Sequence, residues 1–175
     1  MNKVYYAEKG LYVGITAIIC AFYFFAPTLF TFKSSLIEQN GEIENLKTFY
    51  TQVEDSRGSK SIKSELKFTL NSTQSIYILM KNIGQSRYYE RFEKLEKQLK
   101  KSERATVWIK KNQKEDYKPI VFQIADRNGK ILYDFEESKS HSKFGFRISI
   151  GLGIFGIGLY LRHRYMKKSS LQQRI

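Results

Sequence analysis

The side chains that most often do chemistry in proteins are scarce in this chain of 175 residues. Only two histidines occur, His141 in a Ser/Lys-rich stretch and His163 between two arginines, and Cys20 is the single cysteine. Adjacent carboxylates such as Glu136 and Glu137 would point in different directions on a strand or turn, so they are expected to be solvated. The central part of the chain contains no metal-ligand spacing, nucleophile elbow or glycine-rich phosphate loop. The sequence therefore predicts no catalytic residue, no cofactor and no metal site.

Basic side chains offer a different chemistry, the binding of an anionic partner. Arg87, Arg91 and Lys94 lie on a predicted helix and Trp108 follows on a predicted strand, so these four are candidate partner contacts. The same helix pairs acids with bases at i, i+4 spacing, for example Glu90 with Lys94, which also fits a solvated helix face. Nucleic-acid binding is the competing use of a basic small barrel, and it would require a cytoplasmic domain.

Two apolar stretches near the ends of the chain determine how such residues would be positioned. Residues 11–32 contain no charge over 22 positions, which at about 1.5 Å per residue spans a hydrocarbon core of about 30 Å. Residues 144–161 are also long enough if Arg147 lies at one interface and extends its guanidinium toward the headgroups. Both stretches are predicted transmembrane helices.

Small residues recur along both predicted spans every third or fourth position. Such residues let helix backbones approach closely in lipid, so they are predicted to pack the spans on each other or on another protein, including a second copy. The alternative is that glycine is simply common in membrane helices. The candidate packing residues are Gly14, Ala17, Ala21, Gly145, Ser149, Gly153 and Gly156.

Charges beside the spans predict the orientation in the membrane. The C-terminal tail is basic without any acid, and short basic flanks stay in the cytoplasm, so both termini are predicted to be cytoplasmic. The residues with this topogenic or membrane-surface role are Arg147, Arg162, Arg164, Lys167 and Lys168.

This orientation divides the chain into five parts in a cytoplasmic membrane. They are an N-terminal tail at residues 1–10, a span at 11–32, an extracytoplasmic domain at 33–143, a span at 144–161 and a basic tail at 162–175. The domain itself has 22 Lys and Arg against 16 Asp and Glu, a net charge of +6. Long loops are translocated largely regardless of charge, so this excess does not reverse the prediction.

Hydrophobic patterning predicts a β-rich domain with one helix. Alternation at period two marks strands at residues 61–70, 74–80, 104–111, 118–125 and 130–135. Residues 86–101 repeat apolar side chains at period 3.6 and predict an amphipathic helix with Ser86 as its cap. Residues 41–53 fit either a strand or a helix, and residues 33–40 and 136–143 are read as linkers.

The resulting order is β-β-β-α-β-β-β, which predicts an α+β, mostly antiparallel domain. An OB-like small barrel has this order, and a pleckstrin-like or plain α+β sheet with one helix fits nearly as well. The segment at 74–80 is apolar on both faces, which predicts a central strand.

Several segments together resemble small, uncharacterised bacterial two-span membrane proteins of the domain-of-unknown-function type. The matching features are the Gly-Glu-Ile start at Gly41, the strand at residues 66–70, the Lys-rich helix before residues 107–109, and the Ile-Leu-Tyr strand at 131–133 that leads into the second span. The resemblance implies a membrane location and no particular chemistry.

These observations predict a non-enzymatic membrane protein whose extracytoplasmic domain binds or positions another envelope component, as an accessory or immunity-type protein would. The expected partners are the bilayer, another membrane or envelope protein, and a second copy through the glycine-rich spans. The alternative is a hydrolase or transferase that acts at the membrane surface. That alternative expects acids such as Glu65, Asp126 and Asp134 to converge in one cleft.

Overall fold

A computed structural model describes residues 3–86 and 89–172 of the chain. The chain divides into two compact units. One unit consists of Met1–Thr31 together with Lys139–Ile175, and is called the helix unit below. The other unit consists of Phe32–Ser138 and is called the domain.

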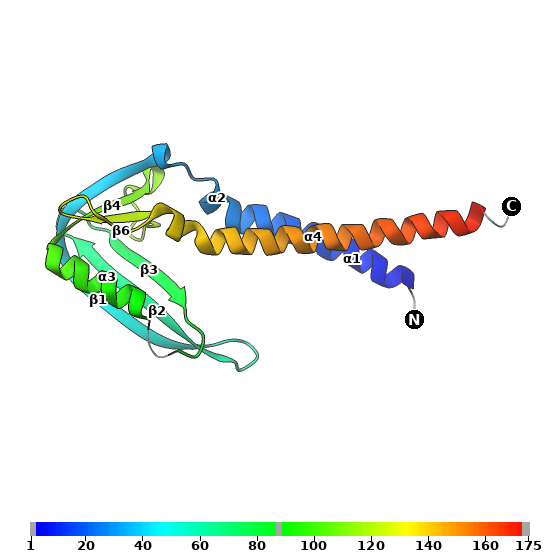
Figure 1. Ribbon diagram of the computed structural model, residues 1–175, viewed down its shortest axis with the longest axis horizontal. Helices are drawn as coiled ribbons and strands as arrows, with labels where there is room; N and C mark the ends of the chain where they lie inside the picture. The colour runs from blue at the N-terminus through cyan, green and yellow to red at the C-terminus, as the bar shows by residue number, and fades with distance from the viewer. Residues whose placement is uncertain (1–2, 87–88, 173–175) are drawn as a thin grey trace. The chain divides into compact units, whose positions relative to one another are not determined.

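The helix unit is built from two apolar segments (Figure 1). The first comprises α1 (Lys3–Cys20), a π-helical turn η1 (Ala21–Phe25) and α2 (Ala26–Leu29). Pro27 has no backbone N–H to donate, and the Ala26 N–H bonds to the Ala21 carbonyl, so the wider turn lies just before the proline. The second segment is α4 (Phe135–Gln172).

Both segments contain a helix long and apolar enough to cross a membrane, at Ala7–Leu29 and Phe135–Met166. The second helix is longer than the span expected at residues 144–161, because residues 136–143 are helical and do not form a linker. The other expected linker is also wrong in part, since β1 begins at Leu36.

The domain contains one open antiparallel sheet of six strands, so the α+β class is confirmed. Along the chain the strands are β1 (Leu36–Glu54), β2 (Lys60–Leu70), β3 (Ile76–Asn82), β4 (Arg104–Lys110), β5 (Gln123–Asp126) and β6 (Ile131–Tyr133). Their spatial order is β3-β2-β1-β4-β5-β6. The OB-like barrel is not confirmed, because β3 and β6 end the sheet on opposite sides and do not pair with each other.

The predicted central position of β3 is wrong, since this strand lies at an edge. Its Tyr77 and Leu79 are buried, while Met80 on the other face is 59% exposed. The apolar residues of β3 therefore belong to two different faces of the strand. One face is turned toward the core and the other is exposed. Periodicity alone does not distinguish this arrangement from a strand buried on both faces.

The ambiguous segment at residues 41–53 belongs to the 19-residue strand β1. Its pairing with β2 shifts between Glu44 and Lys47, and Asn45 there adopts a left-handed backbone with φ 51°. This irregularity lets both Ile43 and Leu46 pack on the core although they are three residues apart. A spacing of three mimics a helix, which explains why the sequence pattern fits both structures.

The core lies between the sheet and α3 (Glu90–Ser102), which covers one face of the sheet (Figure 1). Phe92, Leu95 and Leu99 form the buried stripe of α3, as its 3.6-residue period predicts. They pack on alternate residues of the strands, among them Leu66 and Val107. The helix begins at Glu90 and its N-cap residue is Tyr89, so Ser86 is not the cap.

Candidate functional site: a polar network and a basic sheet face

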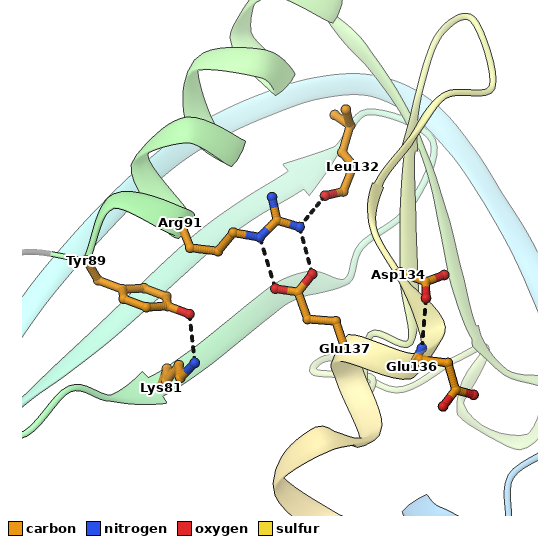
Figure 2. A network of polar contacts seen from close by, with 7 residues as sticks. All are labelled: Lys81, Tyr89, Arg91, Leu132, Asp134, Glu136 and Glu137. Carbon is orange, nitrogen blue, oxygen red and sulfur yellow. Dashed lines mark hydrogen bonds and ion pairs between the residues drawn. The ribbon is translucent and has the colours of Figure 1, made fainter.

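The first candidate site is a polar network centred on Arg91 at the start of α3 (Figure 2). The Arg91 guanidinium donates Nε to Oε1 and Nη2 to Oε2 of Glu137, at 3.0 and 2.7 Å. Nη2 also donates to the Leu132 carbonyl of β6 at 2.7 Å. Glu137 lies in the first turn of α4, so the network joins α3, β6 and the start of α4.

The electrostatics of this network favour a permanent ion pair. The hydrogen bonding of Arg91 to the Glu137 carboxylate outweighs burial and raises the pKa of Arg91 above its ordinary value. Burial, followed by the negative charge of Glu137, raises the pKa of Tyr133 well above its ordinary value, so this phenol stays protonated. The nearby Lys81 donates Nζ to the Tyr89 hydroxyl at 2.9 Å and does not touch Glu137 in the network drawn (Figure 2). The arrangement is suited to holding elements together.

The three predicted partner contacts that the structure describes, Arg91, Lys94 and Trp108, do not form one surface. Arg91 forms an ion pair with Glu137 within the domain, and Lys94 on the same helix pairs with Glu90 at 3.3 Å. Trp108 lies between Val107 and Ile109, which face α3, so the pleat directs it to the opposite side of the sheet, where its Nε1 donates to Glu38. Arg87 lies outside the described residues.

A second candidate site lies on the sheet face opposite α3, over β1, β2 and β3. The register aligns Phe49 with Glu65 and Met80, and it aligns Lys47 with Lys67 in the neighbouring row. Directly paired residues share one face of a sheet. We call this surface the basic face, and its residues are Lys47, Phe49, Lys63, Glu65, Lys67 and Met80.

Ion pairs and aromatic contacts hold the basic face together. Glu65 accepts Lys63 Nζ and Lys67 Nζ, each at 2.6 Å, and these hydrogen bonds lower its pKa below the ordinary value despite burial. Lys47 and Lys67 lie over the Phe49 ring at 5.4 and 5.3 Å from its centroid. With three lysines and one glutamate, the face has a net positive charge.

Sequence reasoning missed the basic face because its residues come from three strands. Period-two spacing does place Lys63, Glu65 and Lys67 on one side of a strand. This signal could have been found within β2. The positions of Lys47 and Phe49 beside them depend on the irregular pairing of β1, which the sequence pattern does not reveal.

A groove of about 620 Å³ lies between the loop after β2 and the loop before β5. Several of its polar side chains are occupied in hydrogen bonds that hold the loops to each other and to β1 and β3. The Gln39 amide accepts the Tyr77 hydroxyl at 2.6 Å, Ser75 Oγ donates to the Asp116 carbonyl at 2.8 Å, and Ser72 Oγ donates to the Asn40 carbonyl. The groove is therefore explained by the structure of the loops.

The acids that an enzyme was expected to gather do not converge. Glu65 lies between its two lysines on β2, and Asp126 accepts the backbone N–H groups of Asn128 and Lys130 in a hairpin turn. Asp134 accepts the Glu136 N–H at the start of α4 (Figure 2). Among residues 3–86 and 89–172, no three His, Cys, Asp or Glu side chains are placed to hold a metal ion.

Several of the small residues proposed for helix packing lie where the two segments of the helix unit meet. A Cβ on Gly14 would be 2.8 Å from the Gly153 carbonyl oxygen, and one on Gly156 would be 3.0 Å from the Gly14 Cα. Gly145 lies against the ring of Phe25. Ala21 is fully buried, while Ala17 and Ser149 are half-buried.

The proposed topogenic residues all belong to α4. Arg147, Arg162 and Arg164 are exposed. The side chains of Lys167 and Lys168 lie outside the described part of the structure.

Comparison of the chain with models of protein families, with curated proteins and with solved structures found no match.

Proposed function

We propose that this chain is a two-span protein of the bacterial cytoplasmic membrane whose extracytoplasmic domain binds another envelope component without catalysis. In this role α1, α2 and α4 anchor the protein, and the domain provides the binding surface. An accessory or immunity-type role fits this arrangement of a small domain held close to the membrane.

One observation carries the proposal: both ends of the domain continue within a few residues into the apolar helices. Asp134 is the only residue between β6 and α4, and residues 30–35 connect α2 to β1. Because the connections are so short, a chain anchored by these helices keeps its domain at the bilayer surface. Partners at that surface then meet the domain at a high effective concentration.

The use of charged groups in the domain supports binding over catalysis. The Arg91 network and the carboxylates of Asp126 and Asp134 have structural partners. The basic face also contains ion pairs, those of Lys63 and Lys67 with Glu65, but it presents in addition the exposed Lys47, a 39% exposed Phe49 and the exposed Met80. Cationic and large apolar side chains on one surface are suited to an anionic or amphipathic partner.

The test is the side of the membrane on which the domain lies. Asn112 is exposed, so Asn112→Cys in a Cys20→Ala background provides one accessible thiol in the domain. A membrane-impermeant maleimide is expected to label this thiol in intact cells, and the Cys20→Ala chain alone is the control. Labelling only after permeabilisation would contradict the proposal and would reopen cytoplasmic partners, including nucleic acid.

A further inference from the structure

We propose that the basic face binds anionic phospholipid headgroups, with its lysines at the phosphates and with Phe49 and Met80 among the headgroups. This inference names the partner of the proposed function and rests on it. No helix of the domain covers this face in the described part of the chain, whereas α3 covers the other face.

The geometry of the face fits a surface and not a small ligand. Pairing aligns Phe49, Glu65 and Met80 across three neighbouring strands, so their side chains rise from one flat patch. Lys47 and Lys67 lie in the adjacent row, and Lys63 lies on the other side of Glu65 along β2. Lys47 and Lys67 lie over the Phe49 ring, so cationic and apolar side chains share one patch, an arrangement suited to an interface between water and lipid.

The charges of the face are complementary to an anionic surface. Glu65 is only 11% exposed and is already neutralised by Lys63 and Lys67, whose side chains are 36% and 38% exposed. Lys47 contacts the Phe49 ring and has no ion-pair partner among the described residues. A layer of phosphates would therefore meet ammonium groups with the carboxylate hidden beneath them.

Lipid is favoured over an acidic protein because of the tether. With Asp134 alone between β6 and α4, a domain anchored by α4 always has headgroups within reach. Each basic residue that reaches an anionic surface strengthens binding about fivefold. Two or three lysines with an exposed Phe and Met then suffice for a contact that needs no high intrinsic affinity.

The first experiment measures whether residue 80 lies at the headgroups. The full chain with Cys20→Ala and Met80→Cys is labelled with an environment-sensitive fluorophore and placed in nanodiscs of phosphatidylcholine, with or without phosphatidylglycerol. Quenching by a headgroup-labelled lipid is expected only with phosphatidylglycerol present. A label at Tyr117→Cys, a position 62% exposed against 59% for Met80, is expected to show no such dependence. Equal quenching in both lipids, or an equal response at residue 117, would overturn the inference.

Charge variants identify the groups responsible. Lys47→Gln with Lys63→Gln is expected to lower the equilibrium constant for contact with the headgroups, obtained from the quenched and unquenched fractions, about 25-fold, because two basic contacts are lost and Lys67 still pairs with Glu65. The matched control is Lys97→Gln with Lys101→Gln on α3, which removes the same charge from exposed positions on a different element. Equal losses in both pairs would show general charge attraction and would contradict a specific face.

Two further outcomes separate the two proposals. If the chain fails to insert into nanodiscs, the proposed function fails, whereas insertion without quenching at residue 80 defeats the lipid inference alone. A photo-reactive amino acid at Phe49 in cells is expected to form adducts with phospholipid. Adducts with a protein instead would overturn the lipid inference and show that this face contacts a protein.

Discussion

The helix unit and the domain pack in opposite ways. In the helix unit, Gly14 and Gly153 meet through their backbones, and an added methyl group would collide with the facing helix. In the domain, Leu66 and Leu99 fill the space between the sheet and α3 and are fully buried. The helix unit packs through close backbone contact at glycines, whereas the domain packs through large buried side chains.

The proposed membrane location of the helix unit explains this difference. In water, burying large apolar side chains releases the most free energy, at about 25 cal/mol per Å². In lipid, apolar side chains gain little from leaving a solvent that is equally apolar, so close backbone contact becomes the main attraction. The many exposed apolar side chains of the helix unit, such as Tyr12 and Phe155, fit this explanation.

Removing volume from the domain core is expected to have the largest effect. Leu66→Ala leaves a cavity beside α3 and is expected to lower the free energy of unfolding by about 2–5 kcal/mol. Urea titration of the full chain in detergent, followed by the fluorescence of the single tryptophan Trp108, measures this loss. Ile120→Ala, at a 46% exposed position, is expected to change little. Equal losses at both positions would show that this core does not determine stability.

Adding volume to the helix unit is expected to rank second. Gly153→Val introduces a branched side chain against Ile18 and Gly14, at an expected overpacking penalty of about 1–3 kcal/mol. Spin labels at the exposed positions 12 and 155 in a Cys20→Ala background report the separation of the segments by pulsed EPR, and the distance distribution should broaden or lengthen. Gly158→Val is the matched control, since a Cβ there meets nothing within 4 Å. An unchanged distance distribution in Gly153→Val would contradict the interpretation that close contact at glycines packs the helix unit.

The smallest effect is expected at Arg91, where the first turn of α4 behaves as part of the domain. Arg91→Ala removes three hydrogen bonds and is expected to destabilise the domain by about 1 kcal/mol, because the pair with Glu137 is partly exposed. Arg91→Lys should recover only part of this loss, since an ammonium group cannot bind both carboxylate oxygens in the same fork. Lys94→Ala, which breaks an exposed pair on the same helix, should cost under about 0.5 kcal/mol. Urea titration distinguishes the three, and an effect of Arg91→Ala no larger than that of Lys94→Ala would contradict this interpretation.

Local patterns predicted most of the elements correctly. The Phe92, Leu95 and Leu99 stripe indicated α3, and alternation at Leu66, Phe68 and Leu70 indicated β2. These signals succeed because one backbone geometry repeats along each element, so the sequence period matches the structural period. The irregular pairing in β1 breaks that repeat, which is why the same reasoning left residues 41–53 undecided.

The candidate sites were less accessible to the same reasoning. Arg91 is a candidate partner contact in the sequence, and the structure pairs it with Glu137, which is 46 residues away in the chain. Trp108 was grouped with the basic helix, although strand alternation alone indicates that it points away from Val107 and Ile109. Contacts between residues far apart in the chain depend on the order of the strands in the sheet. The periodicity of hydrophobic residues along one strand does not reveal that order.

The sequence by itself determined the two apolar helices, the small residues along them, the α+β class and most strand positions, because these depend on composition and on short repeats. Only the tertiary structure decided that the sheet stays open, that β3 lies at its edge, that Arg91 pairs with Glu137, and that lysines from β1 and β2 lie over the Phe49 ring. The physical reason is that register and strand order are set by contacts between distant segments. Their free energy is gained only when the whole core forms.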